Sequence, residues 1–331
     1  MPARTAEPLL AAIIAGVFAA WCLVQAAGTL DPDAYYHFLV SRGIAEGRLW
    51  LDIGWLPYTV LGEAGPDHHW LWHLLLAPFG WLQDPESGLL SATIAGFVLV
   101  PAGMTVFLRA FRVRHAWLWA LLALVAGEVV AGRLMMLRAQ NLALLLVLAT
   151  LYFLYHRQRL ALVIVGFVFM ASYHGAVVLG GIAGLYLAWS WWARGEADWL
   201  SPLLLGCGVL AGLLVTPWPG DNIDYLLFHT LYKTNVTLPG MSGSEWVRLP
   251  LVAVLQQAWP AHLLLAGAVV LRVSIGGWRN GMGTLCLLVT LLFLVLFLTS
   301  WRFVEYYVPL AVVTAAVLLA ERSIPPATTL G

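Results

Sequence analysis

The sequence predicts an all-α, polytopic membrane protein, a transmembrane helical bundle of about ten spans. Of its 331 residues, 61% are hydrophobic and 10% are charged, whereas a soluble domain carries about 25% charged residues. A water-soluble fold could not cover so much apolar surface, so lipid must be part of the solvent. The apolar runs are long, rich in Leu, Ala and Val, and do not alternate like barrel strands, so the spans are expected to be helices.

The number of spans is predicted by comparing the length of each apolar run with the roughly 20 helical residues that cross a bilayer core. The first run follows Arg4 and is longer than the apolar part of a signal peptide, and no clear A-x-A site follows it, so it is expected to span. Residues 1–331 are expected to form a single transmembrane domain with two long outer connections, 29–86 and 217–249. The expected spans are 8–28, 87–108, 115–132, 139–155, 159–173, 175–193, 199–216, 250–271, 281–300 and 304–320.

The distribution of charge predicts the orientation. Short connections rich in arginine stay in the cytoplasm, and the strongest signal is the three arginines between Phe107 and Arg114. The protein is therefore expected in the inner membrane of a bacterium, with both termini in the cytoplasm. Only four of the 17 acidic residues fall on the predicted cytoplasmic side. Acids, histidines and tyrosines gather on the other side, which predicts an active extracytoplasmic face. Nothing in the composition predicts a nucleic acid partner.

The first half of the first outer connection begins with two aspartates. Asp31 suits a helix N-cap, Pro32 the first helical position and Asp33 the first turn, so a helix lying along the membrane interface is expected. Asp33 and His37 are four residues apart and would share a face. The aspartates either only start this helix, or they bind a divalent cation such as Mg or Mn, or they take a proton from an acceptor hydroxyl.

The second half of this connection carries a histidine cluster. His69 and His73 are four residues apart and would share a helix face. One interpretation is an interfacial aromatic helix with Trp70 and Trp72 at the level of the lipid headgroups. The other makes Asp67 and His68 part of a hydrogen-bonded catalytic site. Zinc would need a third protein ligand, and the chain has no HExxH motif.

Three arginines on the predicted outer side are candidates for binding an anionic group. Arg133 and Arg138 lie between the third and fourth expected spans, and Arg302 opens the last one. Arginine stays charged and binds phosphate through two hydrogen bonds, so these side chains could hold a lipid phosphate. Alternatively, the side chains of Arg133 and Arg138 could only extend to the membrane–water interface. Arg302 could pair with Glu305, three residues later in the sequence. Accessory candidates at the same side are Glu128, His174, Glu245 and Glu305.

The run Asp31-Pro-Asp-Ala-Tyr-Tyr-His37, followed by Arg42, resembles the first external loop of oligosaccharyltransferase catalytic subunits, above all archaeal and bacterial ones. The resemblance covers roughly residues 8–80. It implies a fold of GT-C type, the wider group of membrane glycosyltransferases that use polyprenyl-linked sugars. The chain differs in that Trp191-Trp192 is followed by Ala-Arg, where that family reads its acceptor with Trp-Trp-Asp. The acceptor is therefore left open between a glycan, a lipid and a protein.

The resemblance also implies residue roles. In that family a first-loop aspartate activates the acceptor or helps to hold a metal, which transfers to Asp31 or Asp33, with Asp33 favoured as the base. A late outer-loop arginine contacts the donor phosphate, which transfers to Arg302. A second acidic position transfers to Glu128. The implied function is transfer of a sugar from a polyprenyl-phosphate or -diphosphate donor, in cell-envelope glycosylation. The alternatives are a lipid or sugar transporter or flippase, and a non-catalytic envelope scaffold.

Overall fold

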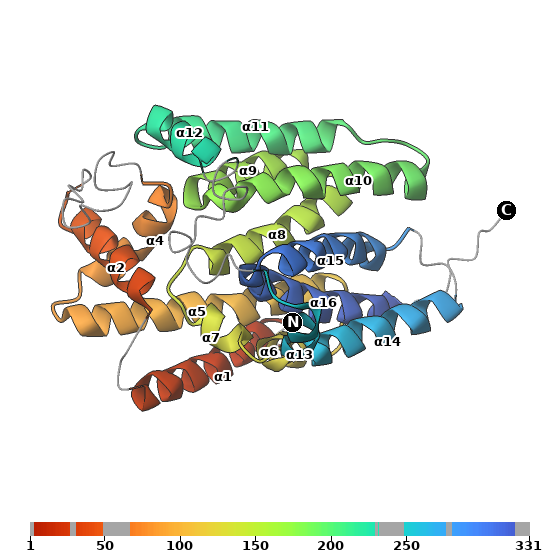
Figure 1. Ribbon diagram of the computed structural model, residues 1–331, viewed down its shortest axis with the longest axis horizontal. Coiled ribbons are helices and arrows are strands. Elements are labelled where there is room, and N and C mark those ends of the chain that lie inside the picture. The colour runs from red at the N-terminus through yellow and green to blue at the C-terminus, as the bar shows by residue number, and fades with distance from the viewer. Residues whose placement is uncertain are drawn as a thin grey trace.

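The structure, a computed structural model, describes residues 3–26, 31–48, 67–228, 231, 248–275 and 280–321. All regular structure in these residues is helical, and most of the longer helices run side by side along one axis (Figure 1). The helices are α1 (Ala3–Gln25), α2 (Pro32–Ala45), α4 (Trp70–Gly80), α5 (Pro85–Ala110), α6 (Ala116–Val125), α7 (Val130–Leu134), α8 (Gln140–Tyr155), α9 (Arg159–Ser172), η1 (His174–Val177), α10 (Val178–Arg194), α11 (Leu200–Val215), α12 (Pro219–Leu227), α13 (Leu251–Gln257), α14 (Trp259–Ile275), α15 (Met282–Thr299), η4 (Trp301–Phe303) and α16 (Val304–Glu321).

The chain has the apolar helices of an integral membrane protein, but fewer of full length than expected. In its described part, five helices are long and apolar enough to cross a bilayer, or up to seven if each of two bent helix pairs counts as one span. Three expected spans form shorter helices, α6, α8 and α9, of 10, 16 and 14 residues. A helix of 16 residues is about 24 Å long, less than a core of roughly 30 Å. The length criterion therefore does not support ten spans.

The two ends of the bundle carry separate sets of ion pairs. Each ion pair between different helices or connections, among the described residues, joins segments that the sequence places on the same side. At the predicted cytoplasmic end, Arg109 lies 3.1 Å from Glu7. At the other end, Arg138 reaches Asp31 across 107 residues of sequence. The alternation of the chain between two ends is thus consistent, and its direction relative to the cytoplasm stays a prediction.

Helices α9 and α11 pack at backbone contact. A Cβ atom built on Gly208 would meet the carbonyl group of Val163, and one on Gly212 would lie 2.6 Å from the carbonyl oxygen of Phe167. The constant offset of 45 residues shows that the two helices run in the same direction. Small residues four apart let membrane helices approach this closely, as they do here. Neither helix could be brought this near with larger side chains.

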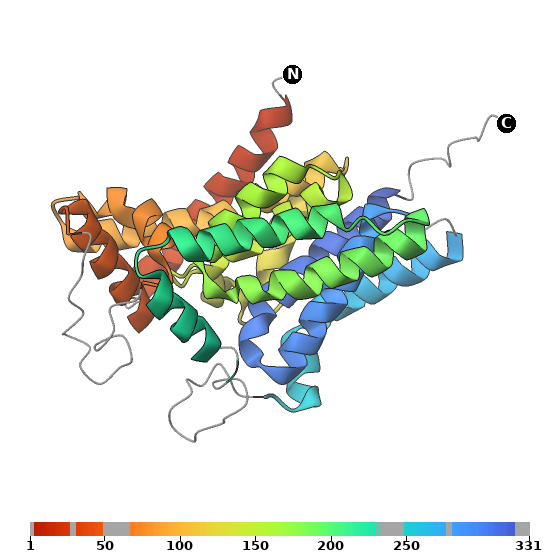
Figure 2. The same cartoon turned by 90° about the horizontal axis from the view of Figure 1, so that it is seen from above.

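Two helix pairs are sharply bent at the end that carries the first outer connection. α11 and α12 meet at 119°, and α13 and α14 at 82°. At the first break, Trp218 has a φ of 59°, a left-handed conformation that is strained for a bulky residue. Figures 1 and 2 show α12 turned away from α11 at the same end as α2 and α4.

Candidate functional site

The start of α2 is tied to the connection between α7 and α8 by Arg138. The Arg138 guanidinium lies 2.9 Å from Asp31 through Nη2 and 3.0 Å from it through Nε, and Nη2 is also 3.0 Å from Asp33. The Arg138 side chain is 8% exposed and that of Asp33 57%. Asp31 stands at the N-cap position, as expected, but its side chain makes no capping bond. The expected capping role of Asp31 is therefore wrong, because its carboxylate accepts from Arg138 instead.

The geometry of this pair bears on the expected cation. The Arg138 guanidinium contacts the Oδ2 atoms of both Asp31 and Asp33. Within the described ranges, no group of three or more His, Cys, Asp or Glu side chains is placed to hold a metal ion. Mg and Mn prefer about six oxygen ligands and no neighbouring cation. A cation would have to share these two carboxylates with Arg138, so the Mg or Mn site stays a prediction and no chemical step is derived from it.

Beside this bridge lies a buried row of three hydrogen-bonded side chains. His37 Nδ1 lies 2.7 Å from His73 Nε2, and His73 Nδ1 lies 2.7 Å from Asp67 Oδ2. The other oxygen of Asp67 accepts the backbone N–H of His69 at 3.0 Å. His73 is fully buried and His37 is 4% exposed. His37 is thus turned into the protein toward α4, whereas its expected neighbour Asp33 faces Arg138.

Burial and mutual repulsion set the protonation of this row. Burial, with the charges of His73, His69 and Arg138, holds the pKa of His37 well below its usual range. Burial and His73 lower the pKa of His69 to about 3. Burial works to raise the pKa of Asp67, but the charge and hydrogen bond of His73 outweigh it and the pKa is lowered. The imidazoles of His37 and His69 are therefore neutral near pH 7, while Asp67 is a carboxylate.

His69 links this row through Tyr173 to η4, the short helix that precedes α16. His69 Nδ1 donates to the carbonyl oxygen of Ser172 at 3.0 Å, and its ring stacks on Tyr173 with centroids 5.6 Å apart. The Tyr173 hydroxyl accepts from Arg302 at 3.2 Å. The first outer connection, the end of α9 and η4 are therefore held together by one continuous set of contacts.

The predicted residues His68 and His174 also meet at this end. The His68 ring lies 5.4 Å from that of His174 and 4.4 Å from that of Tyr225 in α12. The Tyr225 hydroxyl lies within electrostatic range of both Arg302 and Asp33. Tyr225 and His174 also contact each other, with ring centroids 5.8 Å apart.

Arg133 and Glu305 form a buried ion pair. Arg133 Nε donates to Glu305 Oε2 at 2.9 Å, and each side chain is 3% exposed. The guanidinium also lies 5.2 Å from the centre of the Trp301 ring. Glu305 therefore pairs with Arg133 rather than with Arg302, three residues away, and Arg133 is buried rather than reaching the interface. Three guanidiniums, those of Arg133, Arg302 and Arg138, nevertheless lie within electrostatic range of the Glu305 carboxylate.

Of two other predicted positions, the structure describes only one. Glu128 is exposed, and its backbone N–H donates to the carbonyl oxygen of Gln257 at 2.9 Å. Glu245 lies outside the described residues. Trp72, expected at the headgroups, is 2% exposed and packs inside the bundle with α2 and α5. Trp72 therefore lies inside the protein rather than on its surface, and the level of α4 in the membrane stays a prediction.

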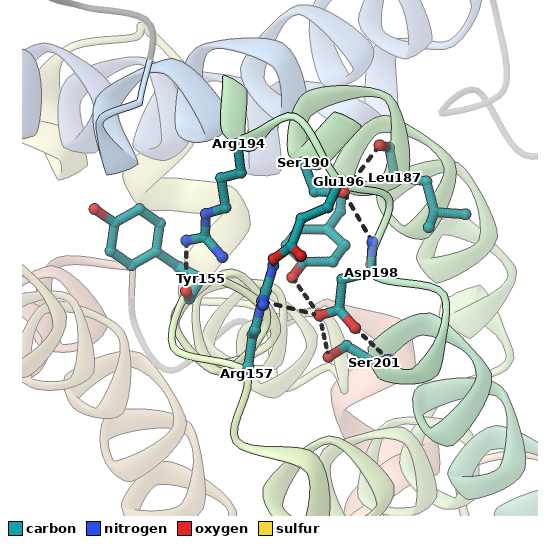
Figure 3. Close-up of polar contacts among 9 residues, drawn as sticks. Tyr155, Arg157, Leu187, Ser190, Arg194, Glu196, Asp198 and Ser201 are labelled. Atoms are coloured by element: carbon teal, nitrogen blue, oxygen red, sulfur yellow. Dashed lines mark hydrogen bonds and ion pairs between the residues drawn. The ribbon is translucent and has the colours of Figure 1, made fainter. Parts of the chain in front are cut away.

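The opposite end of the bundle carries a separate polar cluster (Figure 3). Asp198 accepts from Tyr186 at 2.7 Å and from the Ser201 hydroxyl at 2.6 Å, and Arg157 lies 3.4 Å from it. Arg194 donates to the carbonyl oxygen of Tyr155 at 2.8 Å. These bonds tie the α8–α9 connection to the α10–α11 connection. The carboxylate of Asp198 is satisfied by Tyr186, Ser201 and Arg157, so the cluster is a structural tie.

The site at the other end therefore combines cationic and basic groups from distant parts of the chain. It holds guanidiniums that suit an anionic headgroup and neutral imidazoles that can take a proton. His69, His73 and Tyr173 were not among the predicted site residues, although the spacing of His69 and His73 does place them on one helix face. A comparison of the chain with models of protein families and with curated proteins finds no match.

Proposed function

We propose that the protein is a membrane glycosyltransferase that moves a sugar from a polyprenyl-phosphate or -diphosphate donor to an acceptor. The observation that carries the proposal is the meeting of Arg138, Arg302, Asp33 and the histidine row at one end of the bundle. A lipid-linked sugar phosphate has an apolar chain that suits the spaces between membrane helices. Its anionic head suits arginines near the end of the bundle.

The proposed roles follow from where each group lies. The donor phosphate binds to Arg302, which is partly exposed and donates to the neutral Tyr173 hydroxyl. Arg138, whose charge is shared by Asp31 and Asp33, positions these two carboxylates at the same end of the bundle. The acceptor attacks the sugar carbon directly, with inversion, and the phosphate leaves with the bonding electron pair. Stabilising this charge is expected to contribute more to the rate than the base does.

The proposal places this chemistry at the extracytoplasmic face of a bacterial inner membrane, with both termini in the cytoplasm. The bias of arginines to the opposite short connections supports this orientation. The acceptor can be a glycan, a lipid or a protein, since no described residue selects among them. The resemblance to oligosaccharyltransferase catalytic subunits over residues 8–80 supports a GT-C type of fold, which remains part of the proposal.

The double variant Asp31→Asn/Asp33→Asn is expected to lower sugar transfer by about 10²-fold or more, because Arg138 loses both of the carboxylates that hold it in place. The measurement is transfer of labelled sugar from a polyprenyl-phosphate donor to envelope acceptors, with the full chain in lipid nanodiscs. Full activity of this variant would contradict the proposed role of the first outer connection.

The matched control is Asp221→Asn/Asp224→Asn in α12. Both of these aspartates are exposed and lie at the same end, so the change in charge is the same. Wild-type transfer is expected in the control. Movement of the donor across liposome membranes without transfer would instead favour the transporter or flippase, and indifference of envelope assembly to both double variants would favour the scaffold.

The predicted Mg or Mn site at Asp31 and Asp33 has its own test. A cation there would have to share the two carboxylates with Arg138, so Arg138→Gln is expected to bind Mn²⁺ about tenfold more tightly than the wild type does, a difference of about 1.4 kcal/mol. Titration followed by the electron paramagnetic resonance of free Mn²⁺ measures both affinities. Equal, tight binding by the wild-type protein would show that the cation and Arg138 occupy the site together.

A further inference from the structure

The buried row of Asp67, His73 and His37 has the geometry of a proton relay. Its two hydrogen bonds are each 2.7 Å long, and they join α2 to the start of α4 across 36 residues of sequence. Both imidazoles are buried. Burying two linked imidazoles and a carboxylate is costly unless each is satisfied, and apolar residues would pack the same space at less cost. The row therefore calls for an explanation beyond packing.

The acceptor at one end decides the tautomer of the whole row. Asp67 Oδ1 accepts the N–H of His69, and Asp67 is ionised, so Oδ2 can only accept. His73 must therefore carry its proton on Nδ1 and, when neutral, has a lone pair on Nε2. His37 then donates to it from Nδ1, which leaves the unprotonated lone pair of His37 on Nε2. Within the described part of the chain, no protein group is found bonded to this nitrogen.

We propose that His37 Nε2 is the proton acceptor of the sugar transfer, and that His73 and Asp67 are positioning residues that draw the proton into the protein. The inference rests on the proposed function and gives the proton a different destination from the Asp33 carboxylate, which is already shared with Arg138 and Asp31. Only His37 of the three would touch the reacting atoms.

One bond forms, one bond breaks and two protons move in the proposed step. The acceptor oxygen forms a bond to the sugar carbon while the bond from that carbon to the phosphate oxygen breaks, and its electron pair leaves on the phosphate. The proton of the acceptor hydroxyl moves to His37 Nε2. The proton on His37 Nδ1 moves to His73 Nε2. The products are the glycoside, the polyprenyl phosphate or diphosphate, and a His73 imidazolium paired with the Asp67 carboxylate.

The surroundings of His37 suit a group that passes a proton on. Burial first, then the neighbouring imidazoles His73 and His69 and the guanidinium of Arg138, lower the pKa of His37 and disfavour a charge that stays on it. His69 is neutral and its Nδ1–H is engaged by a carbonyl oxygen, so it does not compete. Tyr36, from α2 itself, has a pKa well above its usual value because it is buried, and stays protonated. His73 is the member of the row that contacts the Asp67 carboxylate, at 2.7 Å.

The first test reads the tautomers without any need for activity. Nitrogen-15 NMR of the full chain in nanodiscs, labelled at histidine, is expected to show His37 protonated on Nδ1 and unprotonated on Nε2 at pH 7. His37→Asn assigns the resonance. In Asp67→Asn the pattern of His73 is expected to change, because the amide can donate to it. A His37 ring protonated on Nε2 in the wild type would overturn the proposal.

The second test measures transfer. His37→Asn keeps an N–H donor near the position of Nδ1 but removes Nε2, and is expected to lower the rate by about 10²–10⁴-fold with little change in donor affinity. His156→Asn, at the opposite end of the bundle, is the control and is expected to keep the wild-type rate. A wild-type rate in His37→Asn, in a protein that transfers sugar, would overturn the relay alone. Absence of transfer in the wild type would instead overturn the proposed function.

The pH dependence separates positioning from mere support of the fold. Wild-type transfer is expected to fall only well below pH ~6.5, the usual pKa of a histidine, because His37 stays neutral there. Asp67→Asn removes the partner of the His73 imidazolium, so the rate of transfer is expected to drop at every pH. The acid limb of the pH–rate profile, the range in which the rate falls as the pH is lowered, is expected to move to lower pH. Asp198→Asn, a buried carboxylate in the cluster of Figure 3, is the control and is expected to leave the limb in place. An unchanged limb in Asp67→Asn would contradict the role of this residue.

Discussion

Replacing Gly208 with leucine is expected to lower the free energy of unfolding by about 3 kcal/mol or more. A Cβ atom at this position would lie 2.8 Å from the carbonyl carbon of Val163, which is backbone and cannot move aside as a side chain can. The nearby Gly166 and Gly212 face the same contact from both helices. The larger residue must therefore push α9 away from α11 along the whole interface.

The control for this change is two residues away on the same helix. A Cβ atom at Gly206 would meet nothing within 4 Å, and Gly206 is exposed. Gly206→Leu is therefore expected to leave the apparent melting temperature in detergent near that of the wild type, while Gly208→Leu lowers it sharply. Equal melting temperatures for the two variants would show that α9 and α11 do not pack as described.

The second large effect is expected at the buried pair of Arg133 and Glu305. Each side chain is 3% exposed, so Glu305→Gln leaves the charge of Arg133 buried without its counter-ion. Breaking such a pair is expected to cost about 3–5 kcal/mol of stability. Removing both charges, as in Arg133→Met/Glu305→Gln, costs less than the two single changes added together, by about 2 kcal/mol, because neither variant side chain is charged.

This double-mutant cycle is measured by thermal unfolding in detergent, together with donor binding. Because Glu305 neutralises Arg133, the double variant is expected to bind polyprenyl phosphate almost as well as the wild type. A large loss of donor binding in the double variant, with little change in stability, would instead restore the predicted phosphate-binding role of Arg133.

The helical membrane class was predictable because it follows from composition alone. A charged fraction of 10% spread over long apolar runs leaves no soluble alternative. The number of spans was not, because hydropathy does not show where a run breaks. The expected span 115–132 is divided between α6, which ends at Val125, and the short helix α7, which begins at Val130.

The membership of the site was partly predictable from single segments. Asp31, Asp33 and His37 stand out within a few residues of each other, and α2 does begin at Pro32. Their partners were not predictable, because they come from far along the chain. Local spacing suggested that Asp31 caps its own helix, and nothing near it in sequence indicated Arg138, 107 residues later.

The same limit applies to the pairs built across helices. The spacing of Arg302 and Glu305 predicted a local pair, yet Glu305 pairs with Arg133, 172 residues earlier. The relay of His37 and His73 needs α2 and α4 to pack face to face, which no periodicity reveals. The spacing rule gives neighbours on one helix, whereas the choice of partner on another helix depends on tertiary packing.

The central claim is that the outer groups meet to bind an anionic polyprenyl head. The most direct measurement is photocrosslinking of a polyprenyl-phosphate analogue to the full chain in nanodiscs, followed by peptide mapping. Labelling is expected on α2, on the connection between α7 and α8 around Arg138, and on η4 around Arg302, and to be competed by polyprenyl phosphate but not by polyprenol. Labelling that polyprenol competes equally well, or that maps to the cluster around Asp198, would contradict the account.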